Sequence, residues 1–240
     1  MFIAVTSDRS IVATGSHDTT VMVWEIIRGK KRVKHAQQEA HVIAETPFRI
    51  LCGHDDIITC LYASVELDVV ISGSKDGTCV FHTLHDGRYI RSIRHPTGSP
   101  LSKLAASRHG RIVLYSDDDL SLHLYSINGK HIASSDSNGR LNCLELSCCG
   151  EFMVCAGDQG QIVVRSMSSL EIVKKYSGIA KVITSLTITP EDCFLAGTKD
   201  GNLLVYSIEN LQIRKTSGQL KARASWLVFG LQFCIVGVNT

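Results

Sequence analysis

The sequence predicts an all-β protein built from repeated four-stranded antiparallel sheets, and three observations carry that prediction. A short motif recurs five times along the 240 residues. Each recurrence lies among runs of β-branched and aromatic residues, and the spacing between runs leaves no room for crossover helices. Units of this kind cannot bury an apolar face alone, so neighbouring sheets are expected to stack on one another.

The recurring motif starts at a glycine or small residue, passes through an acidic or amide turn residue, and ends six residues later on an aromatic, His or Arg residue. Its five copies run over 15–24, 73–82, 116–125, 156–165 and 197–206. The final residues of successive copies are 58, 43, 40 and 41 positions apart. The first interval becomes regular if about fifteen to eighteen residues within 28–46 are an insertion.

The second repeat shows how one unit supplies four strands. Runs rich in β-branched and aromatic residues predict strands at 57–62, 69–72, 78–82 and 89–93. The turn between the second and third strands holds Asp76, whose carboxylate can accept backbone N–H bonds two residues further on, and Gly77, which tolerates a positive φ. The same turn position is acidic in three other repeats, at Asp18, Asp119 and Asp200.

Composition excludes several classes of protein. Hydrophobic residues make up 44% and charged residues 20% of the chain, so it is neither disordered nor collagen-like. A net charge of +2 gives no chain-wide attraction to nucleic acid or membranes. Nine cysteines, mostly in apolar runs, indicate buried reduced thiols. With no signal peptide at residues 1–5 and no apolar run of about 20 residues, a cytoplasmic location is expected.

Candidate catalytic and metal-binding residues do not assemble into a recognisable site. Ser16, His17 and Asp18 are neighbours on one turn and cannot align as nucleophile, base and orienter. Residues 79 and 82 of the Cys79, His82 and His85 set point to opposite faces of a strand, which favours a buried thiol beside two solvated imidazoles.

Two further groups lead to the same conclusion. Cys148, Cys149 and Cys155 lack the paired spacing of structural zinc sites. Asp117, Asp118 and Asp119 lack the further ligands of a calcium loop. We therefore expect no catalytic residue, no metal, no cofactor and no enzymatic activity.

The sequence resembles WD repeats in having Gly53-His54 near the start of a repeat, Ser72-Gly73-Ser74-Lys75-Asp76 in its middle and, in the first repeat, Trp24 at the end. That resemblance implies a β-propeller with one four-stranded blade per repeat, here five recognisable blades. It also implies a structural hydrogen-bonded turn network, whose members would be Asp18, His54, Asp76, Asp119, Asp200 and Trp24. The family tryptophan is present only at Trp24, so the network is expected to be partial.

A closer resemblance covers residues 2–215. The chain resembles the C-terminal propeller of BEACH-domain proteins of the neurobeachin group, and most closely its neurobeachin-like members. The resemblance rests on the sequence segments 44–48, 51–61, 70–79, 121–130 and 196–201. Proteins of that group carry PH-like and BEACH domains upstream, so the chain resembles a fragment or short isoform. The resemblance implies a propeller over 1–215 followed by an atypical apolar tail at 216–240, and it leaves open whether five blades close a ring or form part of one.

The resemblance implies a non-catalytic protein-interaction scaffold in vesicle trafficking and protein localisation, in the cytoplasm or peripheral on intracellular membranes. Expected partners are other proteins, including the BEACH and PH-like region of the parent protein. The expected partner-binding face consists of Asp55, Asp56, Lys75, Arg140, Lys181 and Lys199. The alternative is a propeller that binds anionic lipid or nucleic acid through the basic insertion, at Arg28, Lys30, Lys31, Arg32 and Lys34. No aromatic residue is interleaved with these charges, so a solvated loop is favoured and nucleic acid is not expected as a partner.

Overall fold

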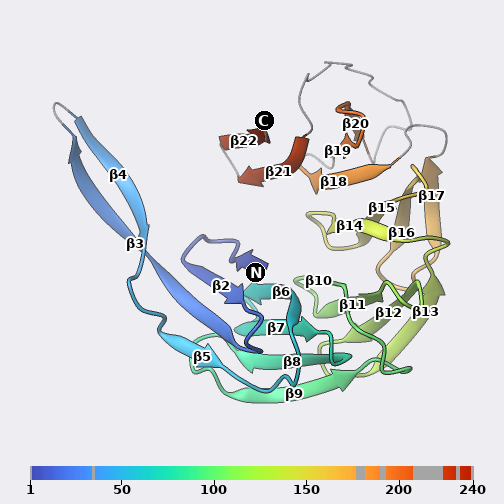
Figure 1. The fold of residues 1–240 in the computed structure, drawn as a ribbon, viewed down its shortest axis with the longest axis horizontal. Coiled ribbons are helices and arrows are strands. Elements are labelled where there is room, and N and C mark those ends of the chain that lie inside the picture. The colour runs from blue at the N-terminus through green and yellow to red at the C-terminus, as the bar shows by residue number, and fades with distance from the viewer. Residues whose placement is uncertain are drawn as a thin grey trace. The chain divides into compact units, whose positions relative to one another are not determined.

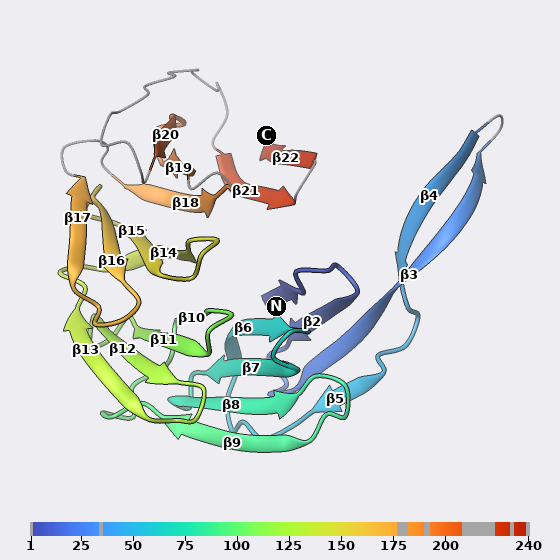
Figure 2. The same ribbon diagram turned by 180° about the vertical axis from the view of Figure 1, so that it is seen from behind.

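The computed structural model describes residues 2–33, 36–176, 182–189, 193–207, 224–230 and 233–238. Within these ranges the regular structure consists of β-strands (Figures 1 and 2). The chain divides into two compact units, one of residues 1–110, 114–119 and 127–130, the other of residues 111–113, 120–126 and 131–240. Over the described residues, no helix has the length and apolar character needed to cross a membrane.

The first sheet contains the insertion that the repeat spacing predicts. Its strands are β1 (Phe2–Val5), β2 (Ile11–Gly15), β3 (Val21–Val33), β4 (Ala36–Ile43) and β5 (Arg49–Leu51). The start of β3 pairs with β5, and the remainder, from Ile26 onward, pairs with β4 as an antiparallel hairpin that extends beyond the rest of this sheet (Figure 1). The backbone of the insertion is therefore a hairpin between the third and fourth blade strands, and the expectation of a solvated loop was wrong about its conformation.

The second sheet has the four strands expected from its repeat, with ends that differ by no more than two residues. They are β6 (Ile58–Ser64), β7 (Val69–Ser74), β8 (Thr78–Thr83) and β9 (Tyr89–Arg94), paired in chain order. Gly77 takes a φ of 78° in the turn between β7 and β8, a backbone conformation that favours glycine.

The first two sheets bury a shared core. Ala13 and Val23 of the first sheet pack in one cluster with Ala63 and Val70 of the second. The sheets approach so closely that a Cβ on Gly15 would lie 2.5 Å from the side chain of Ile58. Burial of this apolar surface is the main force that holds the two repeats together.

The opposite face of the first sheet carries exposed apolar side chains. Ile3 pairs with Thr14 as Leu61 pairs with Ser72, so Ile3 occupies in the first sheet the place that Leu61 occupies in the second. Leu61 packs against the shared core, whereas Ile3 is 58% exposed. Val5 and Ile50 are also exposed.

The remaining three repeats each correspond to one further sheet. The third sheet contains β10 (Lys103–Ala106), β11 (Arg111–Ser116), β12 (Ser121–Ser126) and β13 (His131–Asp136). The fourth contains β14 (Leu141–Leu146), β15 (Phe152–Gly157), β16 (Ile162–Ser166) and β17 (Ile172–Tyr176). The described part of the fifth contains β18 (Ile183–Ile188), β19 (Cys193–Thr198) and β20 (Leu203–Ser207). The tail contributes one more antiparallel pair, β21 (Ala224–Gly230) and β22 (Phe233–Val238).

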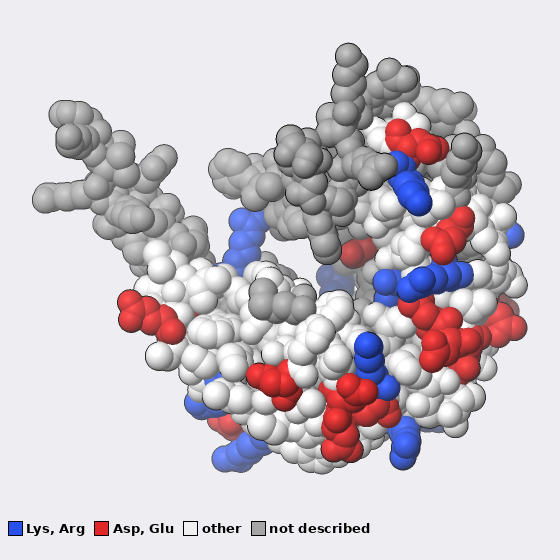
Figure 3. Space-filling view, in the orientation of Figure 1, with Lys and Arg blue, Asp and Glu red and all other residues white. Residues whose placement is uncertain are grey.

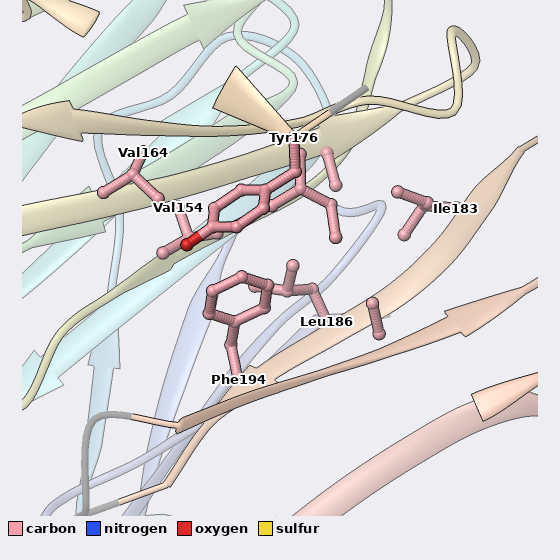
Figure 4. Packing of buried hydrophobic residues seen from close by; sticks show 9 residues of the cluster. Val154, Val164, Tyr176, Ile183, Leu186 and Phe194 are labelled. Atoms are coloured by element: carbon pink, nitrogen blue, oxygen red, sulfur yellow. The ribbon is translucent and has the colours of Figure 1, made fainter. Parts of the chain in front are cut away.

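The core of the second unit repeats the packing of the first. Figure 4 shows Val154, Val164 and Tyr176 of the fourth sheet against Ile183, Leu186 and Phe194 of the fifth. The rings of Tyr176 and Phe194 meet edge to face with centroids 5.7 Å apart. In both units, therefore, one face of a sheet covers the opposite face of the sheet that follows it in the chain.

Candidate functional site

The second sheet contains a hydrogen-bonded network that ties the loop before β6 to the β7–β8 turn. The His54 Nδ1 atom lies 3.3 Å from Oδ2 of Asp76 and 2.9 Å from Oγ1 of Thr78, and Nε2 lies 2.8 Å from the hydroxyl of Ser72. Asp76 also accepts bonds from the backbone N–H of Asp55 at 2.9 Å and of Thr78 at 2.7 Å. The carboxylate thus joins two segments separated by about twenty residues in sequence.

Burial and hydrogen bonding set the charge states of this network. Burial lowers the pKa of His54, although the carboxylate of Asp76 favours the protonated imidazole. Burial alone would raise the pKa of Asp76, but the hydrogen bonds from Thr78 and Asp55 outweigh it, so that the pKa lies below the ordinary value. At neutral pH the pair is therefore an anionic acceptor beside a neutral imidazole.

The first sheet has part of the same network. The indole N–H of Trp24 donates to the hydroxyl of Thr14 at 2.9 Å. Asp18 accepts from the backbone N–H and hydroxyl of Thr20, at 3.0 and 2.6 Å, within its own turn. Thr14 lies four residues before Asp18, and Ser72 lies four residues before Asp76. This shared spacing could have identified the hydroxyl groups of Thr14 and Ser72 as members of the network from the sequence.

At the position of Trp24, the second repeat has His82, and the expectation that this imidazole is solvated was wrong. Its side chain is buried, its Nε2 lies 3.1 Å from the carbonyl oxygen of Cys52, and its ring meets that of Tyr89 edge to face. Burial lowers the pKa of His82. The other two members of that set lie as expected, Cys79 buried and His85 exposed beside Asp68.

The third repeat replaces the imidazole with hydroxyl groups. Asp119 accepts hydrogen bonds from the hydroxyls of Thr97 and Ser99, the second at 2.8 Å. The buried His95 has its Nδ1 atom 2.9 Å from the Thr97 hydroxyl and 3.7 Å from Oδ2 of Asp119. Sequence reasoning missed these hydroxyls, although Thr97 precedes Asp119 by the same 22 residues that separate His54 from Asp76.

The fourth repeat replaces the tryptophan with a buried cation. Arg165 is 3% exposed and donates to the hydroxyl of Ser135 at 2.7 Å and to the carbonyl oxygens of Asp136 and Leu170 at 2.7 and 2.9 Å. Burial lowers the pKa of its guanidinium. In the fifth repeat, Asp200 is exposed in the turn between β19 and β20.

The residues expected on a partner-binding face divide between the two units. Asp55, Asp56 and Lys75 are exposed on the first unit, on the two segments that Asp76 joins, and Arg140 and Lys199 are exposed on the second. Lys181 lies outside the described residues. On the face drawn in Figure 3, acidic and basic side chains of the described residues are interspersed.

Metal-ligating residue types remain dispersed. In the described ranges, no group of three or more His, Cys, Asp or Glu side chains lies close enough to hold a metal ion. Cys60, Cys79 and Cys155 are buried, and burial raises the pKa of the Cys60 thiol to about 11 and that of Cys155 to about 12. Cys52 is exposed.

Comparison with known proteins places these repeats in one family. The family model described as the neurobeachin beta propeller domain matches residues 1–216. BEACH domain-containing protein B of Arabidopsis thaliana is 72% identical over 222 residues, which cover 90% of this chain. BEACH domain-containing protein lvsE of Dictyostelium discoideum is 28% identical over 85% of the chain, and a putative neurobeachin homolog of Caenorhabditis briggsae is 26% identical over 89%.

The matched region is a small part of each relative. It covers 8% of the Arabidopsis protein and 9% of each of the other two. The match to the family model spans the five repeats, including the turns that carry His54, Asp76 and Asp119. The chain belongs to the neurobeachin β-propeller family.

Proposed function

We propose that this propeller is a non-catalytic protein-interaction scaffold of a longer BEACH-domain protein that acts in vesicle trafficking and protein localisation. The observation that carries the proposal is the bond network of Asp76, which holds the exposed Asp55, Asp56 and Lys75 on joined segments of backbone. A surface held in one conformation loses little conformational entropy when a partner binds. Charges of both signs at that surface give specificity and speed the encounter.

The chemistry of the network supports binding without catalysis. Both ring nitrogens of His54 lie within hydrogen-bond distance of side chains in the same sheet, and the imidazole is buried. A general base needs an accessible nitrogen within reach of a substrate proton. The polar groups of this network therefore stabilise the blade and are not presented to a substrate.

The proposed partner is the BEACH and PH-like region of the parent protein, with other proteins bound through the same surface. The proposed location is the cytoplasm, peripheral on intracellular membranes. Binding can be measured by calorimetry between this chain and the purified BEACH and PH-like region of the Arabidopsis relative. We expect the double change Asp55→Lys with Asp56→Lys to weaken binding at least tenfold, since it reverses two exposed charges on the bonded loop.

Glu66→Lys with Asp86→Lys is the matched control. Both residues are exposed in turns at the end of the sheet away from Lys75, so reversing two charges there should leave affinity unchanged. Equal losses in both variants would indicate a long-range charge effect and contradict a defined surface. Unchanged affinity in the variant at Asp55 and Asp56 would remove this loop from the interface.

The alternative proposal is that the β3–β4 hairpin binds anionic lipid. What supports it is the run of basic residues in β3, between Arg28 and Arg32, on a paired backbone. Sedimentation with vesicles of phosphatidylserine and phosphatidylcholine tests it. Lipid binding through these charges must fall steeply between 50 and 200 mM salt, by roughly tenfold or more. It must vanish when Arg28, Lys30, Lys31, Arg32 and Lys34 are all replaced by glutamine.

A further inference from the structure

The loop between β9 and β10 carries a Ser-Pro dipeptide at the point where the third repeat departs from the second. In the second repeat the turn carboxylate lies 3.3 Å from an imidazole nitrogen, whereas in the third Asp119 accepts from the hydroxyls of Thr97 and Ser99 and the nearest imidazole nitrogen, of His95, is 3.7 Å away. A hydroxyl can be esterified by a phosphoryl group, and this modification changes its charge. Ser99 is followed directly by Pro100, the pairing that proline-directed kinases recognise.

The Ser99 hydroxyl lies in a polar, solvent-facing turn. Thr97 is exposed, Ser99 and Pro100 are half-buried, and the side chain of Asp119 is 31% exposed. We propose that Ser99 is a phosphorylation site of a proline-directed serine/threonine kinase, and that phosphate at this position opens the β9–β10 loop.

The loop is bonded to the β7–β8 turn at both of its ends. The backbone N–H of His95 donates to the carbonyl oxygen of Gly77 at 2.8 Å, and that of Leu101 donates to Ser74 at 3.1 Å. Leu101 is buried, and its carbonyl oxygen accepts from the hydroxyl of Thr59 at 2.5 Å. Between these ends, the bonds of Thr97 and Ser99 to Asp119 hold the middle of the loop.

The modification transfers the γ-phosphoryl group of ATP to Oγ of Ser99. An O–P bond forms at Ser99, the bond between the γ-phosphorus and the bridging oxygen of the β-phosphate breaks, and ADP leaves. The hydroxyl proton passes to the catalytic base of the kinase. The product carries a charge of about −2 where the hydroxyl had donated to Asp119 at 2.8 Å, so a hydrogen bond is lost and two like charges meet.

Two other hydroxyl-bearing residues precede proline and supply a comparison. Thr46 is exposed between β4 and β5, and within the described part of the chain its hydroxyl makes no hydrogen bond. The hydroxyl of Thr189 is buried. Phosphate on Thr46 therefore serves as an internal control for kinase activity that leaves the β9–β10 loop unchanged.

The test uses the full chain, a purified mitogen-activated protein kinase and magnesium ATP. Peptide mass spectrometry on the wild-type chain should find phosphate on Ser99 as well as on the control residue Thr46, and Ser99→Ala should remove only the phosphate on Ser99. Hydrogen exchange then reports on the loop, because the amides of Gly98 and Leu101 are both bonded. We expect phosphate on Ser99 to speed exchange of these amides at least tenfold.

Asp119→Asn identifies the cause of the opening. A neutral amide can donate to the phosphate, so we expect the phosphorylated variant to exchange within threefold of its unphosphorylated form. Modification of Thr46 without Ser99 would overturn the site. Phosphate on Ser99 with unchanged exchange would overturn the opening, and equal acceleration in Asp119→Asn would overturn the role of charge.

Discussion

The imidazole of His54 and the carboxylate of Asp76 lie 3.3 Å apart across 22 residues of sequence, and each has further bonds to the same sheet. His54 reaches inward to Ser72, whereas Asp76 holds the backbone of the loop that carries Asp55. The pair thus connects the inside of the blade to its exposed turns. Stability of the second sheet and presentation of its surface depend on the same two side chains.

Replacing Asp76 by Ala should destabilise the protein by about 1 to 3 kcal/mol, because the N–H groups of Asp55 and Thr78 lose their acceptor. Asp118→Ala, at an exposed neighbour of the equivalent turn position, should change stability by less than about 0.5 kcal/mol. Urea denaturation measures both. Equal midpoints for Asp76→Ala and the wild type would refute the structural role of this carboxylate.

Stability should depend on pH through His82. Its pKa is lowered in the folded state, so the unfolded chain binds the proton more readily and stability falls as pH drops below the unfolded value of 6.5. Tyr125 occupies the equivalent position in the third repeat, and His82→Tyr removes this titration. The difference in unfolding free energy between wild type and variant should therefore shift in favour of the variant between pH 7.5 and 5. A constant difference over that range would show that His82 does not contribute.

Arg165→Ala should cost about 3 kcal/mol, since it leaves three buried or half-buried acceptors without their donor. Arg165→Lys should recover only part of this loss, because one ammonium group cannot reproduce the planar fork of the guanidinium. Thermal unfolding with calorimetry compares the three proteins. If the lysine variant matches the wild type, a simple positive charge suffices and the fork geometry is irrelevant.

Shortening the β3–β4 hairpin should leave the first sheet intact. The bonds between β3 and β5 involve residues 21–23 and 49–51, outside the hairpin, and loop-closure entropy changes slowly with length. A chain in which residues 28–41 are replaced by a two-residue turn should differ in stability by about 1 kcal/mol or less. A loss of several kcal/mol in chemical denaturation would mean that the hairpin supports the blade.

The positions of the strands could be predicted from the local sequence, but the burial and hydrogen-bond partners of individual side chains could not. The strands of the second sheet were predictable because alternation and turn residues are encoded within one repeat. Whether His82 is buried depends on what packs over it, a property that its own strand does not specify. The hydrogen-bond partners of Arg165 could not be predicted either, because Ser135 and Asp136 belong to the preceding sheet.

The partner-binding residues illustrate the same limit. Exposure of Asp55, Asp56 and Lys75 could be predicted from their places in turns. The hydrogen bond from the backbone N–H of Asp55 to Asp76 was found only in the structure. In the third repeat, residue type does not reveal that Thr97 and Ser99 bind the turn carboxylate in place of a histidine, although Thr97 has the same 22-residue spacing from Asp119.

The packing of Ala13 and Val23 on Ala63 and Val70 has a direction along the chain, since each face covers the opposite face of the sheet that comes next. During synthesis, the earlier sheet of each pair leaves the ribosome first, and the later sheet can pack against its apolar face. Assembly can then advance along the chain one repeat at a time, because the later sheet of each pair meets a partner that has already been made.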